Sequence, residues 1–313
     1  MLILLAAGAL LVGLVILTRA ADVFVGTAEG VAVHLRWSPA VIGAVVVGFG
    51  TSLPELVTSA AAAFDGQAEI AIGNAAGSNV ATLLLILGTA AVIAPIRGTG
   101  TGPGRDIAIA SGGGLLLVVL SLSGALGLLD GALLVAALVG TVAWQVVTGR
   151  AGQLEAAATG RLRPLIVRVV LGLAGVVVGA RLLVYGATVI ATELGVPAIV
   201  IGSVLVAIGT SLPELATAVA SARRGQTQLL IGNLIGSNAF NALGVVGVAS
   251  LIGVARDDVL VIDTPGLAVV AAAGVVTVAI GTWLWRRPRV SRLAGIALVA
   301  LYAASVPLLL AVS

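Results

Sequence analysis

Long apolar segments joined by short polar connections follow one another along the whole chain. A helix needs about 20 mostly apolar residues to cross a bilayer, and ten segments come near that length. They cover residues 1–19, 39–64, 69–94, 106–125, 128–148, 164–185, 196–222, 228–253, 264–285 and 293–312. Residues 20–37 are semi-polar and can continue the first helix at a tilt. The pattern predicts an all-α polytopic membrane protein with ten transmembrane helices.

The composition narrows the class of protein further. Of the 313 residues, 60% are hydrophobic and only 9% are charged, whereas a soluble domain has about 25% charged residues. This excludes a soluble enzyme and a disordered chain. All 16 basic residues are arginines, mostly in short loops, which indicates membrane topology and no nucleic-acid partner. The chain has no cysteine, so disulfides and thiolate metal sites are excluded.

The arginines also predict the orientation, because cytoplasmic loops collect basic residues. If the N-terminus is outside, nearly all loop arginines face the cytoplasm, and Arg256 is the exception. The opposite connections carry acids such as Asp65 and Asp130. Both termini are therefore expected to be extracytoplasmic. No basic residue precedes Arg19, so we interpret the first segment as a retained helix rather than a cleaved signal peptide.

Two sequence motifs occur twice. GTSLPEL stands at Gly50–Leu56 and at Gly209–Leu215, and IGNxxGSN stands at Ile72–Asn79 and at Ile231–Asn238. Both pairs are 159 residues apart, since 209 − 50 equals 231 − 72. We infer an internal duplication with halves 1–150 and 151–313. Five helices per half is an odd number, so the second repeat is expected to be inverted, with a substrate site near the bilayer midplane.

Each GTSLPEL motif places a carboxylate beside a helix break. Pro54 and Pro213 interrupt apolar segments, and a proline removes a backbone donor and clashes with the preceding turn. Glu55 and Glu214 follow them directly. A charge at the bilayer centre costs about 2.5–3.5 kcal/mol, and neither segment contains a basic partner. A bound cation is the partner that these features predict.

Hydroxyl groups accompany both carboxylates. Thr51 and Ser52 stand four and three residues before Glu55, so they can share its helical face, and Thr210 and Ser211 repeat this before Glu214. The following segments carry Ser78, Thr82, Ser237 and Asn241 at four-residue spacing. Ligation by oxygen alone suits Ca²⁺ or Na⁺ rather than softer metals.

The second motif adds a scaffold. We expect Gly73 with Gly77, and Gly232 with Gly236, to let the motif helices within a repeat pack closely. Four asparagines are expected to bridge backbone groups rather than to contact ions: Asn74, Asn79, Asn233 and Asn238.

The paired motifs resemble the α-repeats of the cation/Ca²⁺ exchanger superfamily, and most closely those of the prokaryotic sodium/calcium exchangers. The resemblance implies ten helices, a prokaryotic-type cell membrane, and first and sixth helices that slide across a rigid core. It also implies adjacent cation sites in mid-membrane. By this resemblance the ligands are Glu55, Glu214, Thr51, Ser52, Thr210, Ser211, Ser78, Ser237, Thr82 and Asn241, with the carbonyls of Gly48 and Ala207. Thr82 stands where the family pattern has Asn, and Asn241 where it has Asp.

These inferences predict a secondary antiporter that exchanges Ca²⁺ for Na⁺, with both ions as substrates, no cofactor and no evident obligate protein partner. A Ca²⁺/H⁺ antiporter is the main alternative, because a buried carboxyl group can also carry a proton. A cation channel is less favoured, since channels usually build their pores from rings of ligands. An intramembrane serine hydrolase lacks a base, because His34 is the only histidine and lies between two apolar segments.

Overall fold

The fold is seen in a computed structural model that describes residues 2–97, 104–149, 161–195, 207–255, 259–286 and 289–312. The described chain is mostly helical. The first half contains α1 (Leu2–Leu35), α2 (Pro39–Ile42), η1 (Gly43–Gly48), α3 (Phe49–Thr51), α4 (Leu53–Phe64), α5 (Ala68–Ala81), η2 (Thr82–Ile86), α6 (Leu87–Ile93), α7 (Gly104–Ser121) and α8 (Leu128–Thr148). The second half contains α9 (Leu162–Glu193), α11 (Ala207–Thr210), α12 (Leu212–Arg223), α13 (Thr227–Ala239), η4 (Phe240–Val245), α14 (Val246–Ala255), α15 (Thr264–Arg286) and α16 (Arg292–Val312).

Six of the helices in the described ranges are long and apolar enough to cross a membrane. The bent pair Pro39–Thr51 and Leu53–Phe64 makes a seventh if it counts as one span. The total of ten spans therefore stays a prediction. The segment predicted at 196–222 begins outside the described residues.

The first helix is longer than the segment predicted at 1–19. It runs without a break to Leu35, so the semi-polar stretch continues it, and Arg19 lies within the helix and not in a connection. Arg19 and Glu29 are exposed, whereas Ala21, Phe24 and Ala28 are buried. The helix continues because its polar residues lie on a different face from the one that packs.

Helix boundaries recur at the offset of the motifs. Leu53 and Leu212 begin α4 and α12, Ala68 and Thr227 begin α5 and α13, and Leu87 and Val246 begin α6 and α14. All three pairs are 159 residues apart, which agrees with the inferred duplication. The η segments are short π-helical turns, and two of them, η2 and η4, also occupy matching places.

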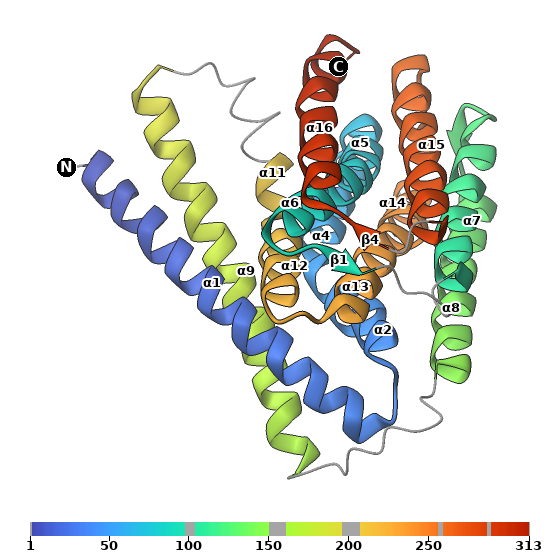
Figure 1. Cartoon of the computed structure of the whole chain (residues 1–313). Helices are drawn as coiled ribbons and strands as arrows, with labels where there is room; N and C mark the ends of the chain where they lie inside the picture. The colour runs from blue at the N-terminus through green and yellow to red at the C-terminus, as the bar shows by residue number, and fades with distance from the viewer. Residues whose placement is uncertain are drawn as a thin grey trace.

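Two short antiparallel ribbons join the halves of the chain. In the first ribbon β1 (Ile96–Arg97) pairs with β4 (Arg289–Val290), side by side in Figure 1. In the second, β2 (Ala125–Leu126) pairs with β3 (Leu260–Val261). Each ribbon takes one strand from each half, so each half completes the edges of the other.

The α1 and α9 helices form a long crossing pair at one side of the molecule (Figure 1). Glycines bring the two backbones together: a Cβ atom at Gly13 would lie 2.6 Å from the Leu183 nitrogen, and one at Gly179 would lie 2.5 Å from the Leu17 nitrogen. A separate hydrophobic cluster, which includes Leu17, Phe24 and Val176, links this pair to the rest. The main core lies elsewhere, around α5, α6, α13 and α14.

Candidate functional site

The two GTSLPEL segments are broken helices, as the prolines predict. The chain bends by 45° between α3 and α4, and the break falls at Ser52, whose φ and ψ are −85° and 6°. Ser211 has nearly the same angles between α11 and α12. Each proline then stands in the first turn of the new helix, where its missing N–H costs nothing. Glu55 and Glu214 follow in those first turns, where the helix dipole favours a negative charge.

The hydroxyl groups cross between the repeats. The Ser52 Oγ donates to Glu214 Oε1 at 2.8 Å, and the Ser211 Oγ donates to Glu55 Oε1 at 3.5 Å. Thr51 also interacts with the Glu214 carboxyl, and Thr210 with that of Glu55. Sequence spacing predicted that each hydroxyl pair would face the carboxylate of its own helix, which was wrong. The break at Ser52 and Ser211 ends the helical register that the prediction assumed.

The helices that follow bring two more serines to the carboxylates. Ser78 on α5 donates to Glu55 Oε1 at 3.4 Å, and its Oγ lies 3.5 Å from that of Ser211. Ser237 on α13 donates to the Gly48 carbonyl at 3.2 Å. The same carbonyl accepts from the Thr51 hydroxyl at 3.2 Å. The structure therefore gathers Gly48 and hydroxyl groups of both repeats around the two acids.

Thr82 and Asn241 lie one turn further along these helices. Thr82 opens η2, Asn241 lies in η4, and each has 1% of its surface exposed. Such π-helical turns often occur at functional sites. Ala207 opens α11, and its side chain lies outside the described set.

Several oxygens at this centre are buried without a hydrogen-bond partner among the described residues. They include Oε2 of Glu55, Oε2 of Glu214 and Oδ1 of Asn241. Glu55 is fully buried and Glu214 is 2% exposed. An unpaired buried acceptor is costly, and a charged one more so. Carboxylate, amide, hydroxyl and carbonyl oxygens fit a hard cation. In the described part, no three His, Cys, Asp or Glu side chains lie close enough together to hold a metal ion. Neutral oxygens would therefore have to complete such a site.

Two of the four asparagines, Asn74 and Asn79, bond backbone carbonyls of other segments, as predicted, whereas Asn233 bonds a hydroxyl and Asn238 bonds the Leu234 carbonyl of its own helix. Asn74 donates to the Glu55 carbonyl at 3.2 Å and to Ser59 Oγ at 2.9 Å, which ties α5 to α4. Asn233 donates to Thr217 Oγ1 at 3.2 Å and ties α13 to α12. Asn79 donates to the Asn238 carbonyl at 3.2 Å and joins the two repeats.

The small-residue face of α13 packs differently from the prediction. A Cβ atom at Gly232 or Gly236 would collide with the backbone of Ala40 or Ala44. The glycines therefore hold α13 against α2 and η1 of the other repeat, and not against the α12 helix of their own. This close approach places Ser237 within reach of Gly48.

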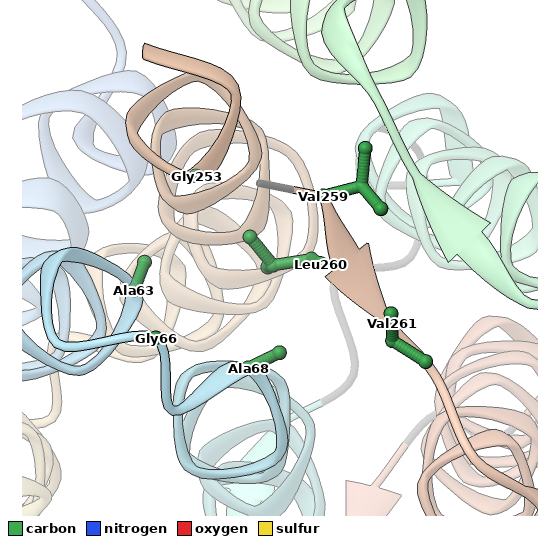
Figure 2. A pocket seen from close by; sticks show the side chains of 7 residues that line it. All are labelled: Ala63, Gly66, Ala68, Gly253, Val259, Leu260 and Val261. Carbon is green, nitrogen blue, oxygen red and sulfur yellow. The ribbon is translucent and has the colours of Figure 1, made fainter. Parts of the chain in front are cut away.

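A small cavity elsewhere has different chemistry. It measures about 90 Å³ and lies where the α4–α5 connection meets α14 and β3, lined by Ala63, Gly66, Ala68, Gly253, Val259, Leu260 and Val261 (Figure 2). None of these residues has a polar side chain. The cavity therefore has no side-chain ligand for an ion.

Comparisons with known proteins agree on one family. The model of the family described as "Sodium/calcium exchanger protein" matches residues 5–147 and 164–311. A solved structure of the sodium-calcium exchanger NCX_Mj, soaked with Na⁺ and Sr²⁺, superposes with a TM-score of 0.86 at 33% identity and covers 97% of this chain and 98% of that one. CaxA of Alkalimonas amylolytica is 35% identical over 281 residues, 84% of this chain and 82% of the relative. The sodium/calcium exchanger MaX1 of Methanosarcina acetivorans is 46% identical over 88 residues, 28% of this chain and 25% of the relative.

Proposed function

Because this chain belongs to the sodium/calcium exchanger protein family, a family of membrane transporters and not of enzymes, we propose that it exchanges Ca²⁺ for Na⁺ by alternating access. The observation that carries the proposal is the pair of buried glutamates, each bonded to a serine of the other repeat. The proposed ligands are the twelve residues predicted from the sequence, with Glu55 and Glu214 as the only acids.

Electrostatic repulsion gives this pair a role in coupling. Two unit charges about 5 Å apart at an effective dielectric of about 20 repel each other by about 3 kcal/mol. The empty site is thus strained and resists the change between the two facing states. One Ca²⁺ neutralises both carboxylates, and Na⁺ ions do the same. Only a protein with a loaded site then changes easily between the two facing states, which is the condition for coupled exchange.

The ribbons support the inverted arrangement of halves 1–150 and 151–313. By position in the repeat, β1 corresponds to β3, since each follows a matching helix, α6 or α14. Yet β1 and β3 belong to different ribbons. In the orientation that the arginines predict, the β1·β4 ribbon lies in the cytoplasm and the β2·β3 ribbon outside. Matching connections then lie on opposite faces, as two inverted five-helix repeats require.

Labelling of single cysteines tests this orientation, because the natural chain has none. Ser291 next to β4 and Ser123 next to β2 are both exposed. We expect a membrane-impermeant thiol reagent to label Ser291→Cys only from the cytoplasmic side and Ser123→Cys only from outside. Labelling of both variants from one side would contradict the inverted arrangement, and the reverse pattern would contradict the orientation.

Ion fluxes test the exchange itself. In proteoliposomes we expect an outward Na⁺ gradient to drive ⁴⁵Ca²⁺ uptake, and K⁺ or H⁺ gradients of the same size to drive none. Uptake driven by H⁺ would favour the alternative Ca²⁺/H⁺ antiporter, since protons also neutralise buried carboxylates. Equally fast uptake with no counter-ion gradient would contradict coupled exchange and favour a channel.

A further inference from the structure

Polar contacts fasten α1 to the connection between α12 and α13. Arg224 Nη2 donates to the Asp22 carbonyl at 3.0 Å, and Gln226 Nε2 donates to Glu29 Oε2 at 2.5 Å. Gly26 lies between them, and a Cβ atom there would be 2.8 Å from Arg224 Nη1. The missing side chain thus makes room for the guanidinium group. We call this set of contacts the first latch.

Apolar packing of α1 on α12 reinforces the first latch, and the matching face of α4 has no such cover. Leu212, Ala216 and Ala220 of α12 belong to the same hydrophobic cluster as α1. The matching residues of α4, 159 positions earlier, are Leu53, Val57 and Ala61, and all three are exposed, Leu53 by 43% and Val57 by 57%. The α9 helix thus leaves uncovered on α4 the face that α1 covers on α12. The two repeats match in sequence but differ in what packs on them.

The same offset identifies the counterpart of every residue in the first latch. Asp65 and Gln67 in the α4–α5 connection correspond to Arg224 and Gln226, and Arg181 and Thr188 on α9 correspond to Asp22 and Glu29. The signs of charge are exchanged between the two sets: Arg224 donates to the backbone carbonyl of Asp22 on α1, and Asp65 would meet Arg181 on α9. Asp65, Gln67 and Arg181 are exposed. Each pair of matching positions thus holds one acidic and one basic residue, Asp22 with Arg224 and Asp65 with Arg181.

We propose that Asp65 and Gln67 form a second latch, which binds Arg181 and Thr188 of α9 when the first latch opens. The inference rests on the proposed alternating access. The α1 and α9 helices share one glycine-lined contact along their length, so they move as a unit, and the closing of one latch opens the other. By the predicted orientation the first latch lies on the cytoplasmic side and the second on the outer side, so each latch stabilises one facing state.

Two double-cysteine variants test the proposal in a chain that has no natural cysteine. Glu29→Cys with Gln226→Cys reports the first latch, and Gln67→Cys with Thr188→Cys reports the second. We expect oxidation to form a disulfide in both variants, each to stop ⁴⁵Ca²⁺ exchange, and reduction to restore it. The four single variants are the controls. Absence of the second cross-link overturns the proposal, and the first cross-link shows that the conditions suffice.

A charge exchange separates a latch from a merely structural contact. Asp65→Arg should slow exchange by about two- to fivefold, as the strength of an exposed ion pair allows, and adding Arg181→Asp should restore the rate. No recovery in the double variant contradicts the pairing. Cross-linking does not depend on which ions move. If both disulfides form in a protein that fails to exchange Na⁺ for Ca²⁺, the proposed function fails and the latches stand. If the protein exchanges these ions but the second cross-link does not form, the latches fail and the proposed function stands.

Discussion

Replacement of Glu55 or Glu214 by glutamine is expected to abolish Ca²⁺ exchange while the protein still inserts and folds. Glutamine keeps the size of the side chain and can still accept the hydrogen bond from Ser211 or Ser52. It removes one of the two charges that are proposed to balance Ca²⁺. Loss of one partner of a buried charge pair is severe, so we expect transport to fall below about 1% of the wild-type rate.

The measurement is Na⁺-driven ⁴⁵Ca²⁺ uptake in proteoliposomes, together with a thermal unfolding curve of each variant. Glu69→Gln is the matched control, because Glu69 is exposed in the first turn of α5 and its loss should leave uptake unchanged. Wild-type uptake by either variant would show that the replaced glutamate is not part of the transport site. Loss of folding along with transport would be distinguished by the unfolding curve.

Replacement of Asn241 by aspartate is expected to make exchange depend strongly on pH. The side chain is buried and its Oδ1 has no hydrogen-bond partner among the described residues. A new carboxyl group here would be protonated in acid, because burial and the two carboxylates of the proposed site favour the neutral form. It would then resemble the amide. As the pH rises it would ionise, add a third negative charge, hold cations more tightly and slow their release.

The test is the exchange rate of wild type and Asn241→Asp as a function of pH. The two rates should agree in acid and diverge by about tenfold or more in alkali, the effect of about 1.4 kcal/mol of added binding. Asn241→Ser is the control, since it alters the side chain but adds no ionisable group, and its profile should parallel that of wild type. If the aspartate variant also runs parallel, position 241 does not face the ions.

The sequence alone predicted those features that depend on local chemistry or on repetition. Pro54 and Pro213 forecast the helix breaks because a proline acts within its own turn, and the 159-residue offset forecast the recurring boundaries. The pairing of Ser52 with Glu214 was not predicted, since it depends on how two segments approach in space. The glycines of α13 failed as a guide for the same reason: a small-residue face tells that a helix packs closely but not on which neighbour.

Some residues outside the motifs carried a signal that was overlooked. Arg181 lies inside a long apolar segment, and an arginine there calls for an explanation. Its correspondence to Asp22 is recognised only when the 159-residue offset of the motifs is applied to the whole chain. The ribbons gave no such signal, because two-residue strands have no periodicity to recognise.

The exchanged ribbons also constrain how the protein is made. Ile96 pairs with Val290 and Ala125 with Val261, so the first half leaves the ribosome with both of its strands unpartnered. Domains generally mature in order during synthesis, but here the strands of the first half find their partners only after β3 and β4 have been translated. A strand edge left open in this interval invites foreign pairing. The extreme shortness of β1 and β2 limits that hazard, because two residues offer little for another chain to join. Native pairing of both ribbons therefore requires that both halves of the chain are present.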